Sequence, residues 1–127
     1  MRIVGHGVDI VEVSRIARLL REHGERFVER TYTPDEASLC RDTRRSDERF
    51  ASRFAMKEAV VKALGTGFAQ GVAHTDVQTL NDSVGRPVVT LTGGAARVAR
   101  ELGITQWQVS LSDSEAYCIA SAIAIAT

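Results

Sequence analysis

The sequence contains almost no lysine. Sixteen of its 127 residues are lysine or arginine, but only Lys57 and Lys62 are lysines. A lysine is a compact point charge with three rotatable donors, whereas an arginine is a wide planar fork. Both lysines lie beside Glu58, and Glu58 and Lys62 are four residues apart, so a helix would place them on one face. The residues alone allow either a solvated surface ion pair or a site that holds phosphate beside a metal.

Cysteine is also scarce, and the chain carries no excess of charge. Cys40 and Cys118 are isolated and have no metal-ligand spacing, so nothing indicates an oxidising compartment. Cys118 lies in an apolar run and is expected to be a small core residue. The formal net charge is zero, which argues against a dedicated nucleic-acid binder.

Long apolar runs are absent. No stretch is long enough to span a membrane. The short apolar segment at the N-terminus is interrupted by Gly5, His6, Gly7 and Asp9, which does not fit a signal peptide. We therefore expect a cytoplasmic protein with neither a membrane nor a nucleic acid as partner.

The composition is that of an ordinary globular chain, with 44% hydrophobic and 25% charged residues. Its length fits one domain over residues 1–127 with a single core. Residues 1–62 hold 13 of the 16 basic and 11 of the 16 acidic residues, so the polar chemistry is concentrated in the first half. The second half is interpreted mostly as scaffold.

The first half is predicted to be mainly helical. An apolar strand over residues 2–10 precedes an amphipathic helix over 14–23. A second helix begins with Thr33 as its cap, and a third covers 47–64. The expected caps and stop signals are Ser14, Ser46, Gly24 and Gly65.

The second half is predicted to be mainly strands. These cover residues 75–80, 87–92, 107–111 and 117–125, with one short helix over 95–102. Small residues occupy one face of the last strand, which suggests that both faces are covered. The fold class is therefore α+β, with an antiparallel sheet packed against helices.

Two carboxylates are candidates for chemistry. Asp9 ends an apolar strand, where a buried carboxylate is costly unless it is paired or bound to a metal; a turn or cap role is the alternative. Glu58 is the second candidate carboxylate. Two carboxylates can hold Mg²⁺, which fills its remaining positions with water and substrate phosphates. The sequence does not show whether Asp9 and Glu58 meet. The three histidines lack ligand spacing and are interpreted as surface or satisfied residues: His6, His23 and His74.

Four separated motifs resemble, in order and spacing, those of the holo-[acyl-carrier-protein] synthases of the 4′-phosphopantetheinyl transferase family. They cover residues 5–16, 53–67, 85–87 and 109–112. The resemblance extends from residue 3 to residue 125. It favours a functional site at Glu58 and Lys62 over a surface ion pair.

The resemblance implies transfer of 4′-phosphopantetheine from coenzyme A to a serine of apo-acyl carrier protein, with release of adenosine 3′,5′-bisphosphate. Such an activity supports fatty acid or polyketide biosynthesis. The resemblance also implies a homotrimer with active sites between subunits, and Mg²⁺ held by Asp9 and Glu58. Lys62 would contact the phosphates, and either Glu58 or a metal-bound water would take the serine proton.

Several further residues match coenzyme A-binding segments of the family. These residues are Arg53, Lys62, Gly65, Thr66, Gly67, Arg86, Pro87, Ser110 and Ser112. Asp113 departs from the pattern, because the family usually has histidine there. An anion at this position should weaken phosphate binding unless it points away or an arginine compensates. A non-catalytic module that binds coenzyme A or carrier protein is the alternative function. An arginine-rich RNA-binding domain is disfavoured by the zero net charge.

Acyl carrier proteins are small and acidic, so a basic surface would attract them. Arg15, Arg18 and Arg21 recur every three residues on the first predicted helix, and Arg15 also lies in the first motif. A solvated helix face is the alternative interpretation. A second possible docking surface is the cluster of Arg41, Arg44, Arg45 and Arg49. Lys57 lies one position away from the face of Glu58 and Lys62, so we expect it to be peripheral.

Overall fold

The structure is a computed structural model that describes all residues from Met1 to Thr127. In chain order its elements are β1 (Arg2–Glu12), α1 (Val13–His23), α2 (Glu25–Thr31), α3 (Pro34–Arg41), α4 (Ser46–Leu64), the short 3-10 helix η1 (His74–Asp76), β2 (Val77–Asn81), β3 (Pro87–Leu91), α5 (Gly93–Glu101), β4 (Gln106–Asp113) and β5 (Tyr117–Ala126). The predicted α+β class is confirmed, with helices mainly early and strands mainly late.

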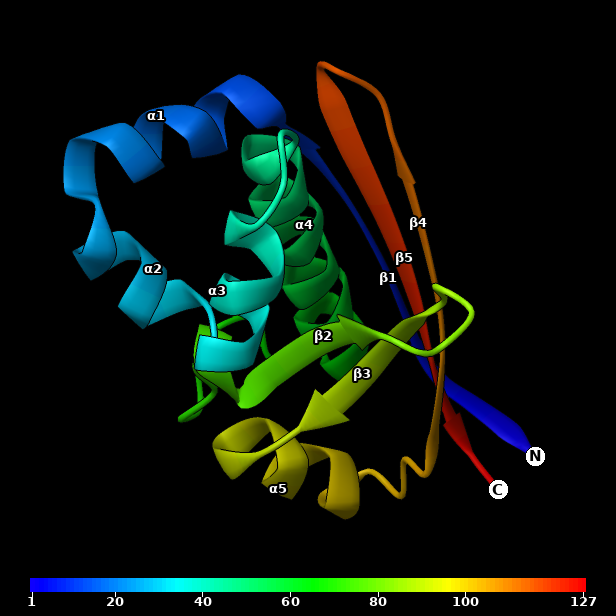
Figure 1. The fold of residues 1–127 in the computed structure, drawn as a ribbon. Helices are drawn as coiled ribbons and strands as arrows, with labels where there is room; N and C mark the ends of the chain where they lie inside the picture. Colours follow the sequence, from blue (N-terminus) through cyan, green and yellow to red (C-terminus); the bar gives the residue numbers. More distant parts are fainter.

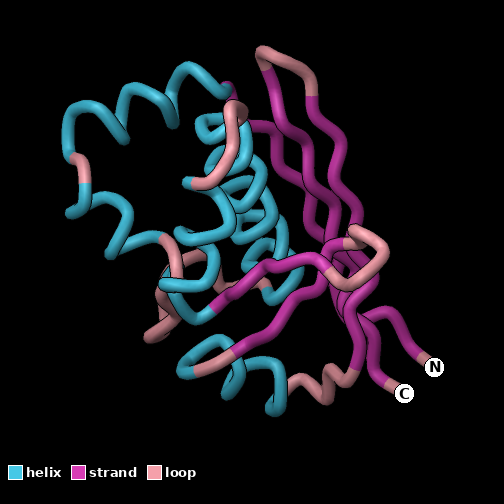
Figure 2. The backbone as a smooth tube through the Cα atoms, in the orientation of Figure 1, coloured by secondary structure: helices cyan, strands magenta, loops and turns pink.

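The strands form two antiparallel sheets. One has the order β1-β5-β4, and the other pairs β2 with β3. Helix α4 lies between the three-stranded sheet and the layer of α1, α2 and α3 (Figure 1). The two chain ends lie close together at one end of the large sheet, where Arg2 pairs with Ala126 (Figure 2). α4 is therefore the central element, in contact with both layers.

Close packing of α4 on β1 depends on small residues. A Cβ added at Gly5 would lie 2.0 Å from the Ala63 carbonyl oxygen, and one added at Gly7 would lie 1.9 Å from the Ala59 oxygen. Both distances are far below van der Waals contact, so only glycine allows this approach of strand and helix. The neighbouring strand β5 turns small buried residues toward the core: Cys118, Ala120, Ala122 and Ala124. Burial of Cys118 confirms the sequence prediction.

Some local predictions were wrong. Ser14 does not cap α1, which begins at Val13 after Glu12, without a side-chain cap. Ser46 is the first residue of α4 rather than its cap. Helix α2 was not predicted, because its seven residues are too few to show a clear apolar stripe. The stop signals at Gly24 and Gly65 are confirmed, and Gly65 adopts the left-handed conformation with φ 83°.

The outer face of the large sheet carries an apolar patch that is uncovered in the single chain. Val8 is 53% exposed and Ile10 is 61% exposed. Ile10 pairs with Ile119, and Tyr117 extends the same apolar face. The prediction that both faces of the last strand are covered is therefore not met within one chain. None of the helices combines the length and the hydropathy that a membrane span requires.

Candidate functional site

Lys62 joins the two candidate segments. Its Nζ donates to Asp9 Oδ1 over 3.0 Å and to the Val8 carbonyl oxygen over 2.9 Å. The Lys62 side chain is 51% exposed, whereas the Asp9 side chain is only 17% exposed. Glu58 lies one helical turn before Lys62 on α4. The structure thus connects Asp9 and Lys62 directly and places Glu58 one turn away.

His74 is a neighbour of Glu58 that the sequence did not reveal. Its Nε2 lies 3.8 Å from Glu58 Oε1. The imidazole stacks on the Phe68 ring with centroids 3.6 Å apart, and on Phe54 with centroids 5.8 Å apart. Because η1 brings His74 back to α4 from outside any local motif, residue spacing could not have indicated this contact.

The donor set of the site suits a hard cation that also binds substrate. No group of three or more His, Cys, Asp or Glu side chains is arranged to hold a metal by itself. Asp9 and Glu58 supply two carboxylates, and Mg²⁺ typically takes one or two protein carboxylates and completes its octahedron with water and phosphate oxygens. The residues present therefore fit a magnesium ion shared with a phosphate ligand, and do not form a complete cage.

Lys57 lies off the face of Glu58 and Lys62, as predicted, but it is completely buried rather than at the surface. Its Nζ donates to Glu36 Oε1 over 2.6 Å, to the His74 carbonyl oxygen over 3.0 Å and to the Val77 carbonyl oxygen. Burial lowers the pKa of Lys57, and the Glu36 carboxylate opposes that shift. Lys57 lies one position before Glu58 on the helix, so its side chain points away from the Glu58 face and toward α3 and β2. Lys57 thus holds η1, and with it His74, in place beside Glu58.

Three arginines converge on a second site, which we call the arginine pocket. Its volume is about 270 Å³. It is lined by Arg45, Glu48, Arg49, Ser52, Arg53, Asn81, Gly85, Pro87, Leu111 and Asp113. Arg53 is only 4% exposed, and one of its terminal nitrogens donates to Asn81 Oδ1 over 3.1 Å.

The Nε of Arg53 is buried without a hydrogen-bond partner. Burial also lowers the pKa of Arg53, which reflects the cost of enclosing its charge. An unpartnered buried donor is unfavourable by about 1 to 3 kcal/mol, more for a charged group. With three arginines in its lining and this cost of buried positive charge, the arginine pocket is suited to an anionic ligand.

The arginine pocket and the Asp9–Lys62 contact lie on different faces of α4. Arg53 and Lys62 are nine residues apart, which is about two and a half turns at 3.6 residues per turn, so their side chains leave opposite sides of the helix. Their partners agree with this geometry, because Arg53 contacts Asn81 at the end of β2 and Lys62 contacts Asp9 on β1. A single chain therefore keeps the two sites apart.

The remaining candidates for coenzyme A binding are scattered. Gly85 and Pro87 line the arginine pocket, whereas Arg86 is not among its lining residues. The 65–67 segment follows the end of α4, where the Thr66 hydroxyl donates to the Gly67 carbonyl oxygen. Ser110 and Ser112 are exposed and lie on the outer face of the large sheet, in register with Ser121 and Ile119.

The three arginines of α1 line an open groove with a volume of about 410 Å³, together with Glu12 and Ser14. Arg15 also places its guanidinium 5.9 Å from the Phe54 ring centroid, and Phe54 in turn stacks on His74. The cluster of Arg41, Arg44, Arg45 and Arg49 is partly neutralised. Arg41 pairs with Glu25, and Arg45 pairs with Glu48 and Asp113. In the α1 groove only Arg18 is paired, with Glu22 over 4.0 Å, so this groove is the less neutralised of the two.

Comparison with known proteins places this geometry in a family. Residues 5–122 match the family model described as the 4′-phosphopantetheinyl transferase superfamily. The holo-[acyl-carrier-protein] synthase of Koribacter versatilis is 46% identical, over 95% of this chain and 97% of the relative. That of Desulforudis audaxviator is 49% identical, over 97% of this chain and 93% of the relative.

Solved structures of holo-[acyl-carrier-protein] synthases have the same fold as this chain. The crystal structure of the Neisseria meningitidis holo-[acyl-carrier-protein] synthase superimposes with a TM-score of 0.90 at 33% identity, covering 98% of this chain and 99% of that chain. The Bacillus anthracis structure in complex with CoA (3′,5′-ADP) superimposes with a TM-score of 0.82 at 31% identity, covering 98% of each chain.

Proposed function

The chain belongs to the 4′-phosphopantetheinyl transferase superfamily, and we propose that it acts as a holo-[acyl-carrier-protein] synthase. In this reaction the serine hydroxyl of an apo-acyl carrier protein attacks the phosphorus that carries pantetheine in coenzyme A. A phosphodiester bond to serine forms, the phosphoanhydride bond breaks, and adenosine 3′,5′-bisphosphate leaves. The observation that carries the proposal is the contact between Lys62 and Asp9 one turn from Glu58, within a chain whose relatives bear this name.

The residues of this site have separate roles in the proposed reaction. Half of the Lys62 side chain is exposed, so its ammonium group can bind a diphosphate oxygen and stabilise the charge that develops on the leaving phosphate. Asp9 and Glu58 would hold Mg²⁺, which supplies charge neutralisation on the diphosphate when it is bound. Glu58 or a water takes the proton of the attacking serine. His74, stacked between two phenylalanines, limits the positions that Glu58 can adopt.

The arginine pocket is the proposed site for the nucleotide end of coenzyme A. Coenzyme A carries a diphosphate and a separate phosphate monoester, so it needs cations at two places. The three arginines of the pocket lining support the second place. Residues 65–67, Arg86, Ser110 and Ser112 are proposed to contact other parts of the same ligand.

We further propose a homotrimer in which each active site is shared between two copies of the chain. Arg53 and Lys62 face opposite sides of α4, so one coenzyme A molecule would take its phosphate contacts from two chains. The uncovered apolar face around Val8, Ile10 and Ile119 supports this assembly, since such a patch on a sheet favours association.

The groove along α1 is the proposed docking surface for the carrier protein. Arg15, Arg18 and Arg21 attract an acidic partner. The near contact of Arg15 with Phe54, which stacks on His74, supports docking beside the reacting groups. Production of holo-carrier protein in the cytoplasm for fatty acid biosynthesis is the cellular role that we propose for this activity.

Mass spectrometry of an apo-acyl carrier protein tests the proposed function. The carrier protein is incubated with the chain, coenzyme A and Mg²⁺. We expect its mass to increase by one phosphopantetheine group at its serine. Binding of coenzyme A with an unchanged carrier mass would instead support the alternative, a non-catalytic module that binds coenzyme A or carrier protein.

A further inference from the structure

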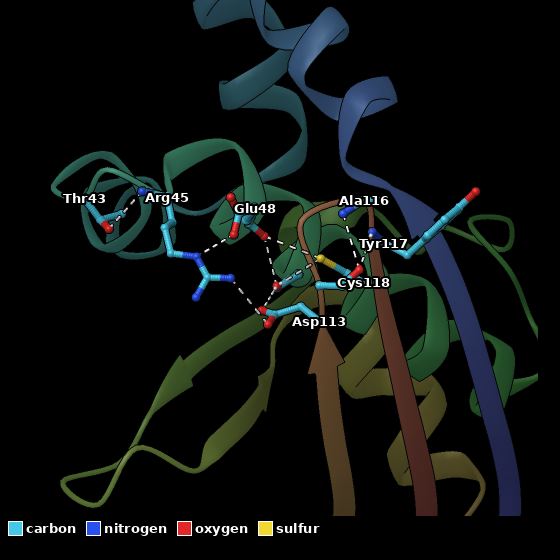
Figure 3. Close-up of polar contacts among 9 residues, drawn as sticks. Thr43, Arg45, Glu48, Asp113, Ala116, Tyr117 and Cys118 are labelled. Atoms are coloured by element: carbon cyan, nitrogen blue, oxygen red, sulfur yellow. Dashed lines mark hydrogen bonds and ion pairs between the residues drawn. The ribbon is translucent and has the colours of Figure 1, made fainter.

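Asp113 places a negative charge in a pocket built from arginines. It is the last residue of β4 and lies at the arginine pocket with Arg45, Arg49 and Arg53. The Arg45 guanidinium lies between two acids, with its Nε donating to Glu48 and its Nη2 3.7 Å from Asp113 Oδ1 (Figure 3). Two acids therefore share one arginine, while Arg49 and Arg53 form no ion pair.

Of these two acids, Asp113 is the loosely held one. Its separation from Arg45 exceeds a hydrogen-bond distance, and the Asp113 side chain is 42% exposed. The Ser52 hydroxyl lies 3.4 Å from Asp113 Oδ2, but only 2.9 Å from the Glu48 carbonyl oxygen. A hydroxyl has one proton, and the shorter contact takes it. Asp113 thus lacks a strong donor, whereas Glu48 can hold Arg45 without it.

We propose that Asp113 competes with the bound phosphate for Arg45 and thereby limits how tightly the pocket holds the nucleotide end of its ligand. The inference rests on the proposed function. An arriving phosphate needs the face of Arg45 that Asp113 now approaches, and the two anions repel each other until the carboxylate moves away. Adenosine 3′,5′-bisphosphate must leave after every transfer, so an acid that weakens its binding favours release.

The exchange Asp113→Asn tests the proposal because it removes the charge and keeps the shape. Isothermal titration of adenosine 3′,5′-bisphosphate into the full-length protein should give a Kd about two- to fivefold lower than that of the unmodified chain, the scale of one exposed ion pair. High salt should reduce this gain through screening. Asp113→Glu retains the charge and should bind nearly as the unmodified chain does. The control Asp42→Asn removes an exposed charge outside the pocket lining and should change nothing.

Dependence on Arg45 distinguishes competition from general repulsion. In an Arg45→Gln background, Asp113→Asn should change the Kd far less, because the shared arginine is gone. An equal gain in both backgrounds would overturn competition for Arg45. Unchanged or weaker binding by Asp113→Asn would overturn the proposal outright.

Failure of this proposal is distinguishable from failure of the proposed function. A chain that binds the bisphosphate but transfers nothing to a carrier protein would contradict the transferase activity alone. A chain that transfers normally, and whose Asp113→Asn variant gains no affinity, would contradict the competition alone. Failure of the unmodified chain to bind the bisphosphate would contradict both.

Discussion

The two lysines of the chain are five positions apart, yet they have entirely different surroundings. Lys62 reaches into solvent and contacts Asp9, whereas Lys57 is enclosed and donates to Glu36 and to two backbone carbonyls. Helical spacing correctly predicted that Glu58 and Lys62 share a face. It could not predict the partner of Lys57, because Glu36 belongs to another helix, and only the packing of α3 on α4 brings the two together.

This difference predicts opposite effects of the same substitution. Lys57→Met leaves the Glu36 carboxylate buried without its partner, which should lower the free energy of unfolding by about 3 to 5 kcal/mol. Lys62→Met removes a half-exposed contact and should cost less than about 1 kcal/mol, while lowering the transfer rate about a hundredfold. Urea denaturation and a steady-state transfer assay measure the two quantities. Equal losses of stability in the two variants would contradict the buried role of Lys57.

At the scale of elements, the packing of β1 against α4 positions the site. The strand itself was predicted from its apolar run, in which the two glycines of β1 appeared only as interruptions. The surface that they approach was not predictable, because Ala59 and Ala63 show no sign of their partner in the sequence. The α4 helix was predicted to within one residue at each end, since charged residues at its start and Gly65 at its end are strong local signals.

Gly7→Ala should disrupt this packing. The added Cβ would overlap the Ala59 carbonyl oxygen, so β1 must move away from α4 and carry Asp9 away from Lys62. We expect a loss of about 3 kcal/mol in the free energy of unfolding, together with a large loss of rate. Thr90→Ala, at an exposed position of β3, is the control for activity and should keep the rate. Gly7→Ala with unchanged stability would show that β1 and α4 are not in such close contact.

The exposed face of α1 carries the docking prediction. Arg15→Glu reverses one charge in the α1 groove, so the KM for carrier protein should rise several-fold while the KM for coenzyme A stays nearly constant. Added salt should raise the KM for carrier protein of the unmodified chain, because exposed charges are screened beyond about 8 Å at physiological ionic strength. If Arg15→Glu leaves the carrier-protein KM and its salt dependence unchanged, docking occurs elsewhere, with the cluster of Arg41, Arg44, Arg45 and Arg49 as the next candidate.

At the scale of the whole molecule, one chain keeps the Asp9–Lys62 contact and the arginine pocket apart and has one uncovered apolar face. Periodicity alone could not show this, because an alternating strand pattern does not reveal whether its second apolar face packs inside the chain or against another chain. Among the residues on that face, Ile10 is 61% exposed. The opposite orientation of Arg53 and Lys62 on α4 independently favours the association of chains proposed above.

Ile10→Glu should therefore dissociate the proposed trimer. A charged side chain on the buried face of an interface is unfavourable, since it loses water without gaining a partner. Light scattering coupled to gel filtration should give the mass of three chains for the unmodified protein and a smaller mass for the variant, with transfer activity lost in parallel. Val84→Glu, at an exposed turn, should retain both mass and activity. An Ile10→Glu variant with the unmodified mass and rate would place the interface elsewhere.

The central claim is that Asp9, Glu58 and Lys62 form the centre of a magnesium-dependent phosphopantetheine transfer. The most direct measurement is the mass of an apo-acyl carrier protein after incubation with coenzyme A and either the unmodified chain, Asp9→Asn or Glu58→Gln, each with Mg²⁺ and with chelator. We predict a gain of one phosphopantetheine only for the unmodified chain with Mg²⁺, while circular dichroism shows all three proteins folded. Full transfer by Asp9→Asn in the presence of chelator would contradict the account.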